Sequence, residues 1–63
     1  MDFADQLNEA FDLGDGLIVL FGDDKLDRRG SFISACNNVL VWADHDGNVV
    51  FTNLGEGISV IKL

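Results

Sequence analysis

Residues 30–46, GSFISACNNVLVWADHD, together with their continuation 47–53, GNVVFTN, decide the fold of this chain. Two apolar runs flank Asn37-Asn38, and asparagine tolerates the φ > 0 conformations that two-residue hairpin turns need. A second turn signal, Asp46-Gly47, separates the second apolar run from a third. The stretch therefore predicts three antiparallel strands joined by two hairpins, over residues 31–36, 39–44 and 48–53.

The two turns also predict which side chains share a face of the sheet. With two residues in each turn, Cys36 pairs with Val39, and Trp42 lies between Ile33 and Phe51. Because side chains alternate across a strand, one face would carry Ile33, Ala35, Leu40, Trp42, Val49 and Phe51. The other face would carry Phe32, Ser34, Cys36, Val39, Val41, Ala43, Val50 and Thr52. Neither face is polar, so we expect both to be covered, as in a rolled barrel with a helix or a second subunit.

The segments on either side add one helix and two more strands. Residues 2–13, DFADQLNEAFDL, place Phe3, Leu7, Ala10 and Phe11 on one stripe of an amphipathic helix, with Asp2 as its N-cap. The apolar run 17–21, LIVLF, is bounded by glycines and predicts a strand, and the run 58–62, ISVIK, which follows Gly57, predicts another. The segment 22–29, GDDKLDRR, reads as a polar connection. The whole predicts a mainly β fold, a five-stranded, strongly bent antiparallel small barrel with one N-terminal α-helix.

Length and composition favour a small domain that associates with copies of itself. Sixty-three residues allow one domain, 1–63, and a chain of this size buries only ~60% of its unfolded surface. A single cysteine excludes an intrachain disulfide, and no cluster of cysteine and histidine has the spacing of a zinc site. Hydrophobic residues make up 48% of the chain, which is rich for so small a domain. Small domains are usually stabilised by disulfides, by a metal or by oligomerisation, and only oligomerisation remains here. We therefore expect a homo-oligomer.

The charge of the chain argues against two classes of partner. Eleven acidic residues against four basic ones give a net charge of −7. This balance opposes binding to nucleic acid, whose affinity comes largely from Lys and Arg, and it opposes attraction to anionic membranes. No apolar run approaches a membrane span, and the acidic, amphipathic N-terminus does not resemble a signal peptide. One free thiol and no leader lead us to expect a cytoplasmic protein.

The sequence offers no convincing catalytic or metal-binding group. Cys36 and His45 would lie at opposite ends of one hairpin, roughly 20 Å apart, so they cannot form a dyad, and Cys36 is expected to be a small buried residue. Asp44, Asp46 and Asn48 resemble the start of a calcium loop, but that pattern also needs a later Gly and Glu that are missing here. A turn explains them better, while a calcium-responsive module remains a further alternative that predicts a rise in melting temperature with calcium. We expect no enzyme activity, cofactor or metal.

The order of a helix followed by five short, bent strands resembles the Sm-like (LSm) small β-barrel family. Gly30-Ser31-Phe32 is similar to the start of the family's second strand, and 38–41, NVLV, to the opening of its third. Ile58-x-x-Ile61 is similar to its last strand. The resemblance implies a ring in which the fourth strand of one subunit, here 48–53, pairs with the fifth strand of the next, here 58–62. The family's Arg-Gly motif, which helps hold RNA, has no match around residues 53–57, so its RNA function does not carry over.

We therefore expect a non-catalytic assembly or adaptor module that self-associates through its edge strands. The residues predicted for this interface are Val50, Thr52, Ile58 and Val60. The alternative function is a divergent Sm-like ring that binds single-stranded RNA. The residues predicted for such RNA contacts are Asn37, Asn38, Arg28 and Arg29.

Overall fold

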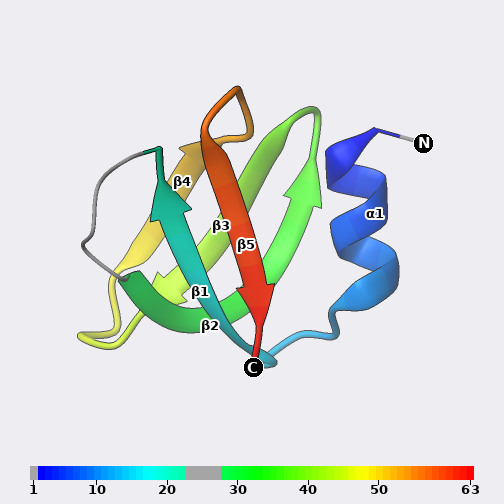
Figure 1. The fold of residues 1–63 in the computed structure, drawn as a ribbon. Coiled ribbons are helices and arrows are strands. Elements are labelled where there is room, and N and C mark those ends of the chain that lie inside the picture. Colours follow the sequence, from blue (N-terminus) through cyan, green and yellow to red (C-terminus); the bar gives the residue numbers. More distant parts are fainter. Residues whose placement is uncertain (1, 23–27) are drawn as a thin grey trace.

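The structure is a computed structural model that describes residues 2–22 and 28–63. These residues form one short helix and one five-stranded sheet. The elements are α1 (Phe3–Ala10), β1 (Gly16–Phe21), β2 (Arg28–Cys36), β3 (Val39–Asp44), β4 (Val49–Asn53) and β5 (Ile58–Lys62). The strands are antiparallel and lie in the order β4-β3-β2-β1-β5 (Figure 1). The prediction of a mainly β fold with five antiparallel strands and an N-terminal helix is confirmed. The sheet does not close on itself, because β4 and β5 form its two edges.

Strand β2 is the longest strand, and it bends so that its two halves have different neighbours (Figure 1). Its first residues, Arg28 to Ser31, pair with β1, whereas Gly30 to Cys36 pair with β3. The strand begins three residues earlier than the sequence predicts, so Arg28 and Arg29 belong to it and not to the preceding polar connection. The rest of that connection, 23–27, lies outside the described residues.

Gly30 makes the bend in β2 possible. It faces Leu17 of β1 and Asp44 of β3, so the chain is crowded on both sides of it. A Cβ atom at this position would lie 2.0 Å from the carbonyl oxygen of Ala43 and 2.8 Å from the Trp42 ring. Only glycine, which has no Cβ, allows the backbone of a neighbouring strand to lie this close. An irregularity in the ladder between Phe32 and Ser34 bends the strand again, as β-bulges do.

The first hairpin has the predicted turn, but its register holds only in part. Asn37 and Asn38 adopt φ of 50° and 64°, as a two-residue turn requires. The predicted pair Cys36–Val39 is confirmed, and the same register continues through Ala35–Leu40 and Ser34–Val41. Beyond the bulge, however, Trp42 pairs with Phe32 and not with Ile33. The bulge inserts one residue into β2, which the turn signals could not reveal.

The second hairpin has a longer turn than predicted, and this reverses the faces of β4. The Asp44 N–H donates to the Asn48 carbonyl at 2.9 Å, so three residues form the loop, with Gly47 at φ 85°. Trp42 therefore pairs with Val50, not with Phe51. Because the side-chain period of a strand is two, one extra turn residue moves every β4 side chain to the opposite face. The prediction that Phe51 packs beside Trp42 is wrong, and Phe51 is 71% exposed.

The core lies between the concave face of the sheet and α1. Leu17, Val19, Leu40 and Trp42 are almost completely buried. The indole N–H of Trp42 donates to the hydroxyl of Thr52 at 3.0 Å, so the one polar atom of this large side chain is satisfied inside the core. The cluster is completed by Ala4, Leu7, Phe11, Phe32, Ala35 and Leu54.

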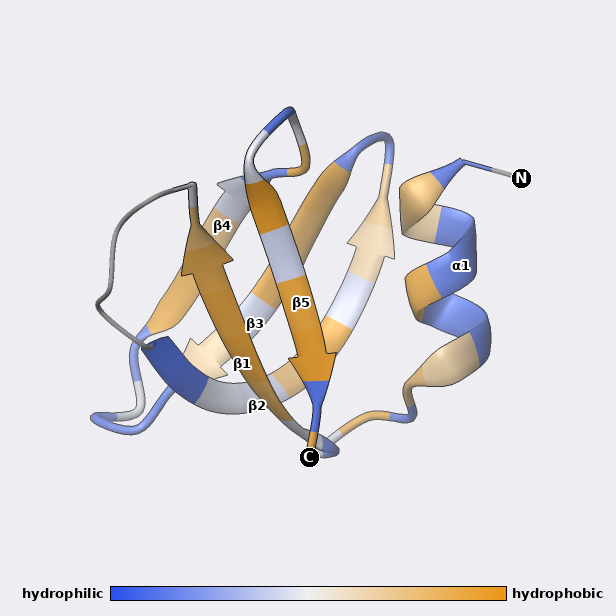
Figure 2. Ribbon diagram, in the orientation of Figure 1, coloured by the Kyte–Doolittle hydropathy of each residue, from blue (hydrophilic) through white to orange (hydrophobic). Residues whose placement is uncertain are grey.

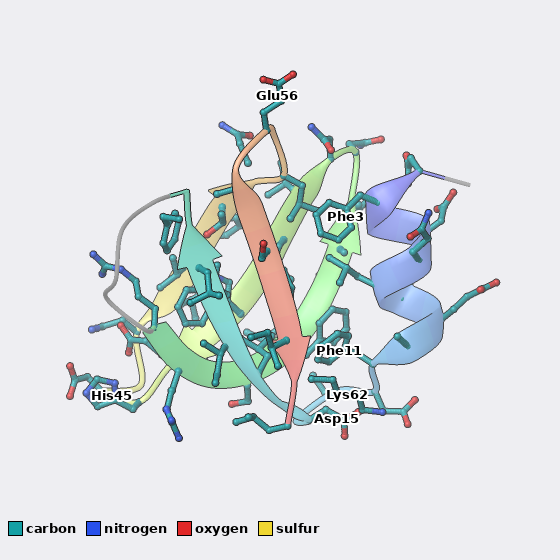
Figure 3. All side chains as sticks on the ribbon, in the orientation of Figure 1. Phe3, Phe11, Asp15, His45, Glu56 and Lys62 are labelled. Atoms are coloured by element: carbon teal, nitrogen blue, oxygen red, sulfur yellow. The ribbon has the colours of Figure 1, made fainter. Side chains whose placement is uncertain are left out.

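Helix α1 is shorter than predicted and covers the second half of β2 (Figure 3). The Asp2 carboxylate accepts the N–H of Asp5 at 2.8 Å, so its predicted role as N-cap is confirmed. Leu7 is buried and Phe11 stacks on Phe32 with ring centroids 5.2 Å apart. Ala10 is exposed and Ala4 is buried in its place, which corrects the predicted stripe.

Substitution Gly30→Ala should lower the free energy of unfolding by at least about 3 kcal/mol, because the new methyl group would overlap the Ala43 carbonyl. Gly55→Ala is the matched control, since nothing lies within 4 Å of a Cβ there, and it should change stability by no more than about 0.5 kcal/mol. Urea denaturation measures both. Equal effects of the two substitutions would mean that β2 does not bend at Gly30 as described.

Substitution Trp42→Ala should cost about 3–5 kcal/mol, because it empties the largest buried site in the described core. Phe51→Ala should cost no more than about 0.5 kcal/mol when measured at a protein concentration low enough to keep the chains apart. Thermal melts followed by circular dichroism compare the two variants. A larger loss of stability for Phe51→Ala than for Trp42→Ala would contradict the observed register of β4.

Candidate functional site

The two edges of the sheet are the most distinctive surface feature of the molecule. Figure 2 shows that apolar residues dominate β1 and β5 and much of β4, while the two hairpin turns on either side of β3 are hydrophilic. β4 pairs only with β3, and β5 only with β1, among the described strands. Each edge therefore presents a row of backbone N–H and C=O groups that no described strand occupies. Such a row is a template for pairing with another chain.

On β4, the outward-facing backbone belongs to Val49, Phe51 and Asn53. The Asn48 carbonyl accepts from Asp44, and the Leu54 N–H donates to the Asn38 carbonyl at 2.8 Å. Residues in an antiparallel ladder alternate between bonding their neighbour and facing away from it. Since residues 48 and 54 bond toward β3, the odd-numbered residues between them face away.

On β5, the outward-facing backbone belongs to Ile58, Val60 and Lys62. The Leu63 N–H donates to the Gly16 carbonyl at 3.0 Å, and the Gly57 carbonyl accepts from Gly22. The same alternation then directs the even-numbered residues of β5 away from β1. The pairings of β4 with β3 and of β5 with β1 are both regular, so no bulge twists either edge out of reach.

The four residues predicted for the interface differ in what they offer a partner. Ile58 and Val60 have outward backbone groups, while their half-buried side chains pack on the core. Val50 and Thr52 bond toward β3 instead, and Thr52 is only 6% exposed, with its hydroxyl bonded to Trp42. Val49, Phe51 and Asn53 were not among the predicted residues. Their outward backbone groups follow from Asn48 bonding toward β3, which both the predicted two-residue turn and the observed three-residue loop require. The longer loop changes only the face on which the β4 side chains lie, and glycine at position 47, which favours a three-residue loop ending in a left-handed residue, was the available signal for it.

Lys62 is the charged residue of the β5 edge, and its side chain reaches toward α1 (Figure 3). Its ammonium group donates to the Ala10 carbonyl at 2.8 Å and lies 3.4 Å from the Asp15 carboxylate. It also lies 5.9 Å from the centre of the Phe11 ring. The Asp12 N–H bonded to Asp15, and then Lys62, hold the pKa of the Asp15 carboxyl below its usual value. The Lys62 charge, which could deter pairing along β5, therefore lies at the end of α1.

The residues predicted to contact RNA do not meet in one chain. Asn37 and Asn38 form the turn at one end of β2, while Arg28 and Arg29 start the strand at its other end (Figure 1). The guanidinium of Arg28 lies 5.5 Å from the centre of the Phe21 ring. All four residues are exposed, yet they form two separate sites and no continuous strip.

The carboxylate of Asp44 organises the turn between β3 and β4. One oxygen accepts the N–H groups of Asp46 and Asn48, at 3.0 and 2.9 Å, and the other accepts the Asn48 amide at 3.3 Å. These bonds, the Asn48 N–H first, lower the pKa of Asp44, and the neighbouring His45 adds to the effect. Both carboxylate oxygens of Asp44 are therefore hydrogen-bonded within the turn.

Cys36 does not behave as the small buried residue that the sequence predicts. It is exposed, because it ends β2 on the face opposite the core. Over residues 2–22 and 28–63, no group of three metal-ligating side chains converges. In that same part of the chain, no helix is long and apolar enough to cross a membrane.

Stability should fall in acid because the native Asp44 has a lowered pKa. A carboxyl of this kind stabilises the fold above its unfolded pKa of about 3.9, and the contribution is lost as the pH drops through the lower native value. The difference in melting temperature between wild type and Asp44→Ala should thus shrink as the pH falls below about 4. A difference that stays constant over that range would contradict the turn geometry.

Comparison of the chain with protein-family models, with curated proteins and with solved structures finds no match in any of the three. What the chain does is therefore inferred from its own residues.

Proposed function

We propose that this chain is a non-catalytic assembly or adaptor module, an Sm-like small barrel that self-associates through β4 and β5. The observation that carries the proposal is the pair of open edges at opposite ends of one sheet. β4 and β5 each have five residues, and each directs three of them outward. Two strands of equal length can form a complete antiparallel ladder.

Pairing β4 of one copy with β5 of the next joins two different surfaces, so each new copy leaves another open edge. A head-to-tail contact of this kind gives a ring if the rotation between copies closes, and a filament if it does not. The ring implied by the resemblance to Sm-like proteins uses the same two strands.

The chemistry of the two edges is compatible with self-association despite the net charge of −7. The strands Val49–Asn53 and Ile58–Lys62 contain no acidic residue, and their one charge, on Lys62, is paired with Asp15. A chain of this length has a small core, so burying further backbone and apolar surface between copies would add stability that the monomer lacks.

Binding of single-stranded RNA is supported less well. The two asparagines and the two arginines lie at opposite ends of β2, and the charge of the chain opposes contact with phosphates.

The proposal is tested by placing proline at an outward-facing position of β4. Asn53→Pro removes one outward N–H and leaves the bonds to β3 intact, because proline is tolerated where an edge strand faces solvent. It should weaken self-association at least about tenfold in sedimentation equilibrium. Asn53→Ala, which keeps the N–H, is the matched control and should associate like wild type.

A wild-type protein that remains monomeric at high concentration would contradict the proposal, as would equal association of the two Asn53 variants. The same samples can be titrated with a labelled single-stranded RNA at low salt. Salt-sensitive binding that is lost on substitution of Arg28 and Arg29 would favour the RNA alternative, and we expect none.

A further inference from the structure

Charge is distributed unevenly over the described part of the molecule. The acidic side chains lie on the helix and in the turns, for example Asp2, Asp5 and Glu9 on α1 and Glu56 before β5. Within the described strands the only acidic residue is Asp44, at the end of β3, where the turn holds it. The described strands consequently place no acidic side chain on the broad face of the sheet opposite the core.

The side chains of this outer face follow from the alternation along each strand. Leu40 and Trp42 of β3 point into the core, so Val41 and Ala43 point outward. On β4, the exposed Val49 and Phe51 point outward beside them, because Val41 pairs with Phe51 and Ala43 pairs with Val49. We call these four neighbouring side chains the outer patch: Val41, Ala43, Val49 and Phe51.

The outer patch is apolar and accessible to solvent. Phe51 is 71% exposed and Val49 is 57% exposed, while Val41 and Ala43 are half-buried. The neighbouring outward side chains on β2, Ser34 and Cys36, are small and uncharged. Large apolar side chains gathered at one place on a small domain mark an interaction surface.

We propose that the outer patch is where a second copy of this chain docks face to face, about a two-fold axis. The occupant is assigned from charge. Each copy carries a net charge of −7, so two copies repel each other wherever their acidic side chains come close. The outer patch contains no acidic side chain, so two copies can meet there without this repulsion. A two-fold contact brings the same surface of both chains together, which an uncharged apolar patch allows without like-charge contacts.

The same observations disfavour other occupants. A cationic partner would need acidic side chains to attract it, and the outer patch has none. An anionic lipid surface would need a cluster of basic groups, and in the described sheet the alternation along β2 puts only Arg29 on this face.

This contact is distinct from the edge pairing proposed above, because it uses side chains of the outer patch and not the outward backbone groups. A molecule with both contacts would form two layers, each joined through its edges and stacked through the outer patch. Either contact can exist without the other, and each can be removed separately.

The experiment removes one contact at a time and measures mass by sedimentation equilibrium. Phe51→Ser keeps the backbone of β4 and, because the ring is exposed, leaves the core filled. Losing two Phe51 rings per pair should weaken the face-to-face contact at least about tenfold. Asn53→Pro alone should leave a dimer, and the double variant Phe51→Ser/Asn53→Pro should be monomeric. Mixed isotope labelling of the Asn53→Pro dimer should give intermolecular contacts between Val41 and Val49 methyl groups.

Salt gives an independent readout. Raising sodium chloride from about 0.05 M to about 0.5 M should strengthen the dimer of Asn53→Pro, because screening reduces the repulsion between two acidic chains. Association of Phe51→Ser equal to that of wild type would overturn the inference, as would a monomeric Asn53→Pro. If the proposed edge pairing is absent instead, wild type and Asn53→Pro would both be dimers and Phe51→Ser would be monomeric.

Discussion

The close contact between Gly30 and the backbone of Ala43 determines the shape of this molecule. Because Gly30 has no Cβ, β2 can bend there while pairing with β1 on one side and with β3 on the other. The bend separates the sheet into two parts that share β2. Those parts enclose the core around Trp42 and Leu17, and they leave β4 and β5 at the two ends of the strand order. The bend of β2 at Gly30 therefore accounts both for the enclosed core and for the two open edges.

The bend also exposes a third stretch of strand, which the N-terminal segment covers. Beyond Ser31, β2 no longer pairs with β1, so the outward backbone groups there need other partners. Phe32 exchanges bonds with Gly14 and Asp15, and the Asn8 side chain accepts the Ala35 N–H at 3.2 Å and donates to its carbonyl. The Asn8 side-chain amide thus makes the two hydrogen bonds that a neighbouring strand would otherwise make with Ala35. Lys62 then joins β5 to the end of α1, so one edge strand is anchored to the helix.

The sequence predicted the elements well because their signals are local. Alternating and continuous apolar runs, Asn37-Asn38 and the Asp2 cap each depend on a few neighbouring residues, and each is found in the structure. The errors arose where one residue changes a register. The bulge after Phe32 and the third turn residue before Asn48 each shift the pairing by one, and no pattern in the apolar runs reports such a shift. Phe51 was therefore placed on the same face as Trp42, whereas it points to the opposite face. The role of Asn8 was missed as well, since a polar residue on a helix gives no sign of the strand it will bond.

The sheet ends in two regular rows of backbone groups with which no described strand pairs, and the proposed self-association depends on them. Hydrogen exchange of individual amides, followed by NMR at increasing protein concentration, tests it most directly. We expect the amides of Val49, Phe51, Asn53, Ile58, Val60 and Lys62 to exchange rapidly in dilute solution and to become protected together as concentration rises. The inward-facing amides of the same strands should be protected throughout. Rapid exchange of the outward amides at every concentration would contradict the account.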